Sequence, residues 1–169
     1  MKPLLALCAA LAMATAVQAQ TPPPAPRPPA VADPTVAPWM TVQALVAKAK
    51  EQRREGQPLV SLLLAQAPGY TARVDYRASV GPANLHETEN EIFYVFEGSA
   101  TLVTGGTLAE PTPLRNGNRN GARVEGGQAR SVMAGDVLFI PAGTPHSFSA
   151  VDKLVVLSIH TAPAPRPAP

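Results

Sequence analysis

The sequence has a single cysteine, Cys8, among its 169 residues. One cysteine excludes a disulfide scaffold and a cysteine-built zinc site. An excess of one charge sign is also lacking, since 14 Lys and Arg stand against 12 Asp and Glu, and aromatic residues make up only 5%. A chain with this balance carries no electrostatic footprint for nucleic acid, and we do not expect nucleic acid as a partner.

The apolar run near the N-terminus is too short to span a membrane. It covers residues 4–17, about 14 residues, whereas a membrane-spanning helix needs about 20. Lys2 before the run and the small residues at Val17-Gln18-Ala19 are typical of a secretory signal peptide. We therefore predict a signal peptide over residues 1–19, a periplasmic or secreted protein, and a mature chain without cysteine. A retained N-terminal helix is the less favoured alternative.

Proline divides the chain. Of the 20 prolines, eight lie between residues 22 and 38 and four between residues 163 and 169. We predict a flexible Pro/Ala-rich spacer over 20–38, one folded domain over 39–161 and a proline-rich tail over 162–169. The folded domain carries 11 basic and 11 acidic residues, so its partner is sought in a pocket and not along a charged surface.

The folded domain begins with a helical pattern over residues 41–54. Its apolar positions share one face, and its charged positions share the other. Thr41 is the predicted N-cap, while Gly56 and Pro58 stop the helix. We expect the helix to pack against the rest of the domain. The apolar face consists of Val42, Leu45, Val46 and Ala49.

Short strands follow, separated by glycine turn signals. This spacing predicts an all-β sandwich or barrel. A long exposed segment over 108–127 contains Asn116-Gly117 and Asn120-Gly121, which favour turns. We interpret it as a surface loop, with or without a hairpin, and a substrate lid is the alternative. The predicted strands are 59–66, 70–79, 91–96, 99–104, 129–133, 137–140, 147–151 and 154–160, with a turn at Glu97-Gly98 between the third and fourth.

Two spaced patterns carry the chemistry. Asn84-Leu85-His86 is followed by Glu91 and Gly98, and Gly135 is followed by Pro141-Ala142-Gly143 and His146. Glu91 shares a strand face with two apolar residues. Burial of even a neutral polar group without a partner costs about 2–7 kcal/mol, so a buried carboxylate is expected to be paired or to bind a metal. The Pro-Ala-Gly turn would aim His146 at the start of the next strand.

These two patterns resemble the motifs of the cupin superfamily, whose members are small jelly-roll barrels, also described as double-stranded β-helices. The resemblance covers residues 70–160. Asn84 stands where the first motif has its first histidine, and Ala150 replaces the final asparagine of the second motif. The resemblance implies an all-β jelly-roll fold with one N-terminal amphipathic helix.

The resemblance also implies one divalent transition metal inside the barrel, either Fe, Mn, Zn or Ni. The implied ligands are His86, Glu91 and His146. Two histidines and one carboxylate form the facial set of non-haem iron sites. Asn84 either adds a fourth, amide ligand or lines the site. His160 either faces the same cavity, as a general base or substitute ligand, or has a structural role, and we favour the structural role.

Glu87 and Glu89 compete with Glu91, but they belong to a polar stretch that we interpret as an exposed turn. The leading hypothesis is a secreted cupin that binds a divalent metal and a small organic ligand. Catalysis of an oxygenase, isomerase or lyase type is left open. The alternative is a non-catalytic ligand-binding or scaffold cupin with a degenerate metal site. A third hypothesis is an interaction protein that docks a partner through the spacer and the helix. A homodimer joined at a sheet edge is implied by the resemblance alone.

Overall fold

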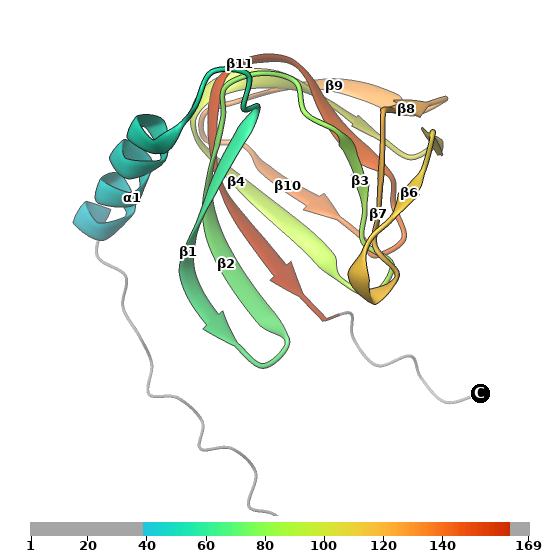
Figure 1. The fold of residues 1–169 in the computed structure, drawn as a ribbon, viewed down its shortest axis with the longest axis horizontal. Helices are drawn as coiled ribbons and strands as arrows, with labels where there is room; N and C mark the ends of the chain where they lie inside the picture. The colour runs from blue at the N-terminus through green and yellow to red at the C-terminus, as the bar shows by residue number, and fades with distance from the viewer. Residues whose placement is uncertain (1–38, 163–169) are drawn as a thin grey trace, which may run out of the picture. The chain divides into compact units, whose positions relative to one another are not determined.

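A computed structural model describes residues 39–162 (Figure 1). The predicted signal peptide, the spacer and all but the first residue of the predicted tail lie outside the described residues. The all-β fold with one N-terminal helix is confirmed. The elements are α1 (Trp39–Gln52), β1 (Leu59–Ala67), β2 (Tyr70–Arg77), β3 (Ala83–Leu85), β4 (Asn90–Thr104), β5 (Thr107–Ala109), β6 (Thr112–Pro113), the 3₁₀ turn η1 (Arg115–Gly117), β7 (Arg119–Gly121), β8 (Arg123–Glu125), β9 (Gln128–Met133), β10 (Val137–Ile140) and β11 (His146–Thr161).

Helix α1 packs its apolar face against the sheet, as predicted. Val42 and Val46 join Val74 of β2 and Val155 of β11 in one buried cluster, and the helix lies beside β1 outside the ring of strands (Figure 1). Thr41 is not the N-cap, because the helix begins at Trp39. The Trp39 ring meets the Phe96 ring at a centroid distance of 5.2 Å, and this tertiary contact stabilises an additional N-terminal segment of helix.

Two long strands form the centre of the jelly roll, where the sequence analysis predicted four short ones. β4 runs through Gly98 without a turn, and β11 runs through residues 150–153. Ala150 and Lys153 have positive φ angles of 46°, and the register between β4 and β11 shifts beside them. The Glu97-Gly98 signal therefore marks a position inside a continuous strand that faces a bulged part of β11, rather than a hairpin turn.

β4 and β11 connect most of the other strands. The sheet runs in the order β1-β2-β11-β3-β7-β6, and β4 pairs with β9, β10 and β11. Opposite His160 in β11 lies Glu91 in β4, and opposite His146 lies Asn84 in β3. This register brings residues from both sequence motifs and from the C-terminal strand to one end of the jelly roll.

The segment predicted as an exposed loop is largely structured. β5 pairs with β8, and β7 pairs with both β3 and β6. Asn116 and Gly117 have φ angles of 57° and 77° and form the predicted turn, between β6 and β7. Asn120-Gly121 forms no turn but lies in β7, where a Cβ on Gly121 would approach the Ala109 carbonyl oxygen at 2.7 Å.

The interior of the jelly roll is apolar on one side of the site and polar on the other. The apolar cluster includes Phe93, Val95 and Phe148, whereas Phe139 is 59% exposed. Phe139 pairs with Ile92 on β4, and its side chain faces outward. Among the described residues, no helix combines the length and the hydropathy that a membrane span requires.

Candidate metal centre

Glu91 lies at the centre of the site. Strand β4 turns Glu91, Phe93 and Val95 to the interior, and all three side chains are buried. The Ser158 hydroxyl donates a hydrogen bond to Glu91 Oε1 at 2.9 Å. Burying a carboxylate among apolar neighbours is costly unless positive charge or several donors surround it.

Three imidazoles surround the Glu91 carboxylate. His146 Nε2 lies 3.0 Å from Oε2, His86 Nε2 lies 3.3 Å from Oε2, and His160 Nε2 lies 3.2 Å from Oε1. The structure thus brings together His86, Glu91 and His146, the three residues that the spacing singled out, and adds His160.

The turn before β11 joins the two motifs. Gly143 N–H donates to the His86 carbonyl oxygen at 2.7 Å, and Thr144 N–H donates to the Pro141 carbonyl oxygen at 3.2 Å. Ala142 N–H donates to the Asn90 side-chain oxygen at 3.0 Å. These bonds fix the position of His86 relative to the start of β11 and therefore relative to His146.

The tautomer of His146 follows from its other ring nitrogen. His146 Nδ1 lies 3.0 Å from the Thr144 carbonyl oxygen, which can only accept a hydrogen bond, so Nδ1 carries the proton. In the neutral ring Nε2 is then a bare lone pair. This lone pair and Glu91 Oε2 are both buried, and neither has a hydrogen-bond partner. Two electron-rich atoms 3.0 Å apart require a cation between them, either a second proton on the His146 ring or a metal ion.

The spacing of these atoms fits a metal ion. Two ligands that each lie about 2.1 Å from a metal ion and at right angles are about 3.0 Å apart, and in a tetrahedron they are about 3.4 Å apart. The imidazole-to-carboxylate distances of 3.0–3.3 Å fall in this range. The donor atoms of His86, Glu91 and His160 all lie within 4.8 Å of one another; this group does not include His146. The residues present therefore fit a divalent metal.

The electrostatics of Glu91 agree with a cationic occupant. Burial would by itself raise the pKa of the Glu91 carboxyl, but the approach of His146, His160 and His86 outweighs burial and holds this pKa well below its ordinary value. Burial would likewise lower the pKa of His160, but Glu91 and Glu89 raise it above its ordinary value. Glu91 is therefore ionised at neutral pH and presents a negative charge to the three rings.

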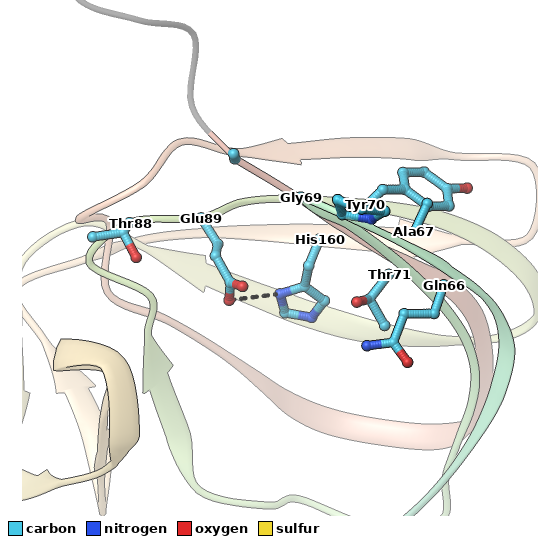
Figure 2. Close-up of a pocket in the computed structure, with 10 residues that line it drawn as sticks. Gln66, Ala67, Gly69, Tyr70, Thr71, Thr88, Glu89 and His160 are labelled. Carbon is cyan, nitrogen blue, oxygen red and sulfur yellow. Dashed lines mark ion pairs between the residues drawn. The ribbon is translucent and has the colours of Figure 1, made fainter. Parts of the chain in front are cut away.

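The side chain of His160 faces the site, beside Glu91, so the structure gives the position that the alternative role requires. Its Nδ1 lies 3.6 Å from Glu89 Oε2 (Figure 2), and its ring stands edge-on to that of His86 at a centroid distance of 4.8 Å. Glu89, interpreted from the sequence as part of an exposed turn, lies at the rim. An outer pocket of about 570 Å³ is lined by Gln66, Ala67, Pro68, Gly69, Tyr70, Thr71, Thr88, Glu89, His160 and Ala162.

Asn84 faces the same interior as His86, two residues further along the chain. Both line an inner cavity of about 160 Å³, and Asn84 Nδ2 donates to the Pro82 carbonyl oxygen at 3.4 Å. Its role as a ligand stays a prediction. The inner cavity is lined by Leu59, Ser61, Arg73, Asp75, Arg77, Asn84, His86, Glu91, Ser158 and His160.

Sequence reasoning missed the polar face of β2. Arg73, Asp75 and Arg77 alternate with apolar residues, a pattern that usually places polar side chains in solvent. Here they line the inner cavity. Asp75 pairs with Arg77 at 3.4 Å, and burial raises the Asp75 pKa against the opposing effect of Arg77. The signal in the sequence that could have indicated this polar cavity wall is the charged residue at every second position of the strand.

The jelly roll with its histidine–glutamate cluster defines a class of small barrel proteins with an internal polar site. The family model for cupins matches residues 63–166, and the chain belongs to the cupin family. No curated protein matches the sequence.

Several solved structures resemble the chain at a distance. KdgF from Halomonas sp. is 18% identical with a TM-score of 0.48, over 66% of this chain and 86% of that one. A putative mannose-6-phosphate isomerase from Ralstonia eutropha JMP134 is 18% identical with a TM-score of 0.45, over 66% and 93%. A predicted oxalate decarboxylase from Thermotoga maritima is 18% identical with a TM-score of 0.45, over 62% and 81%. Likenesses this distant assign no activity to this chain.

Proposed function

We propose that this cupin binds one divalent transition metal through His86, Glu91, His146 and His160 and holds a small organic molecule beside it. The observation that carries the proposal is the bare lone pair of His146 Nε2 facing the ionised Glu91 carboxylate at 3.0 Å in a buried site. Three nitrogens and one oxygen, without thiolate, suit Fe, Mn, Zn or Ni. The imidazole of His146 is oriented by the Thr144 carbonyl and that of His160 faces Glu89, as outer partners orient metal-binding histidines.

The two cavities suit a small molecule that enters past His160. This residue lines both the inner cavity and the outer pocket, so a molecule in the outer pocket reaches the site along the His160 ring. A bound metal would act as a Lewis acid on an oxygen of that molecule. The chain's own residues bind the molecule, orient it through Ser158 and Asn84, and exclude bulk water with the buried cluster around Phe93.

A first experiment measures the ligand set. Purified protein is expected to bind about one equivalent of Zn²⁺ or Mn²⁺ by calorimetry and elemental analysis. His160→Ala is expected to weaken binding at least about tenfold, because loss of even an orienting partner costs about 10–100-fold. Asn84→Ala, in the neighbouring strand β3, is the matched control and is expected to change affinity less than about threefold.

Less than a tenth of an equivalent of any transition metal, after attempts at reconstitution, would refute the metal proposal. A loss in Asn84→Ala as large as that in His160→Ala would instead give Asn84 the fourth position that the cupin motif reserves for histidine. Circular dichroism of each variant separates loss of ligand from loss of fold.

We also propose that the protein is exported. The charged start, the apolar run and the small residues before Gln20 support a signal peptide. When the full-length gene is expressed in a bacterium, the protein recovered from the periplasm or the medium is expected to begin at Gln20. N-terminal sequencing and intact mass measure this start. An intact Met1 or Lys2 on the recovered protein would contradict export by cleavage.

A further inference from the structure

We infer that the inner cavity selects a small carboxylate, held between the metal and the guanidinium of Arg73. The inference rests on the proposed metal site and adds to it the chemical class of the bound molecule. It is carried by the balance of charge around the cavity and by the different surroundings of the two arginines that line it.

The formal charges of the side chains around the inner cavity sum to zero only when no metal is bound. Two arginines and two carboxylates line it: Arg73, Arg77, Asp75 and Glu91. A divalent ion adds two positive charges, which nothing in the cavity wall neutralises. Glu89 belongs to the outer pocket, and counting it still leaves an excess of positive charge. Uncompensated charge in a buried site is costly, so the loaded site calls for an anion.

The two arginines differ in what already neutralises them. Arg77 pairs with Asp75 at 3.4 Å, and its guanidinium carbon lies over the Phe148 ring at 5.0 Å from the centroid. The positive charge of Arg77 is therefore neutralised by Asp75, another residue that lines the cavity. Arg73 forms no ion pair with any residue of the described range 39–162. It is the cation available to a bound molecule.

Arg73 is held in place by one neighbour. Its Nε donates to the Ser61 hydroxyl at 2.7 Å, and its Nη2 lies 3.4 Å from the Ser61 carbonyl oxygen. The other guanidinium hydrogens stay available for a ligand. Arg73 lies opposite Ser158 in the β2–β11 register, and Ser158 donates to Glu91. The guanidinium and the metal site thus share neighbouring positions on the wall of one cavity.

The size and shape of the site favour a small planar anion. A volume of about 160 Å³ is that of roughly five water molecules at about 30 Å³ each. A guanidinium presents parallel N–H groups that match the two oxygens of a carboxylate. A short mono- or dicarboxylate therefore fits, with one carboxylate facing Arg73. Any longer part of the molecule would pass His160 into the outer pocket.

The experiment uses protein loaded with Co²⁺, whose visible spectrum reports ligands at the metal. Acetate, malonate and succinate are expected to give saturable spectral changes, while acetamide and malonamide bind at least about tenfold more weakly. Calorimetry provides a second measure. Arg73→Gln is expected to weaken malonate binding by about 10–100-fold, as expected for loss of hydrogen bonds to a charged group, with Co²⁺ affinity changed less than about threefold.

Two further variants keep the inference falsifiable if Arg73→Gln folds poorly. Arg73→Lys keeps the positive charge but loses the planar arrangement of N–H groups. Its malonate affinity is expected to lie between that of the parent and that of Arg73→Gln. Arg130→Gln, at an exposed position of β9, is the matched control and is expected to bind malonate like the parent. Equal binding of malonate and malonamide, unchanged malonate affinity in Arg73→Gln, or binding of inorganic phosphate without carboxylates would overturn the inference alone. Failure to bind Co²⁺ would overturn the proposed function and the inference together.

Discussion

Glu91→Gln is expected to lower Zn²⁺ affinity by at least about 100-fold while leaving the fold intact. Glutamine keeps the size of the side chain but removes the one negative charge that faces His86, His146 and His160. Loss of an orienting outer partner already costs about 10–100-fold, and Glu91 occupies the central position. The amide also places an N–H₂ group against nitrogen lone pairs, where the metal would lie.

The matched control is Glu89→Gln, which removes a carboxylate that contacts His160 only at 3.6 Å and from the rim. It is expected to weaken Zn²⁺ binding by less than about tenfold, because it acts through one imidazole. Competition with a chromophoric chelator measures both variants, and thermal unfolding without metal confirms that each is folded. Parent-like affinity in Glu91→Gln would show that the carboxylate is not a ligand, whatever its position among the histidines.

The part of the site that could be predicted from sequence is the part encoded locally. His86 and Glu91 are separated by a short segment, and His146 follows a turn whose Pro141 and Gly143 are readable as such. His160 could not be assigned in this way. It meets Glu91 because β11 pairs with β4 in one particular register, and register depends on pairing between distant strands.

The same limit explains the errors about strands. A glycine after a charged residue is a turn signal, and nothing local distinguishes a turn from a bulge in a long strand. Gly98 stays within the strand because β11 bulges opposite it, and residues 152–153 of β11 approach the glycine closely. Arg73 and Asp75 were missed for a similar reason, since alternation reveals two faces of a strand but not which of them encloses a cavity.

Gly98→Ala is expected to lower the free energy of unfolding by about 2–5 kcal/mol. The backbone there has a φ of 76°, which costs a non-glycine residue about 1–2 kcal/mol. A Cβ would also lie 2.4 Å from the carbonyl oxygens of both Asp152 and Lys153. These are backbone atoms of the paired strand, so relief requires β4 and β11 to separate, and forced overpacking costs about 1–3 kcal/mol more.

Gly56→Ala is the control that separates the cost of the backbone conformation from the cost of the contact between the new Cβ and β11. Gly56 has nearly the same φ, 75°, and a Cβ there meets nothing within 4 Å, so its loss is expected to stay within the backbone cost of about 1–2 kcal/mol. Urea unfolding followed by circular dichroism measures both. Equal losses in the two variants would show that β11 does not press on Gly98. A larger loss in Gly98→Ala would tie this position to the site, because the β4–β11 pairing that passes Gly98 continues to Glu91 and His160.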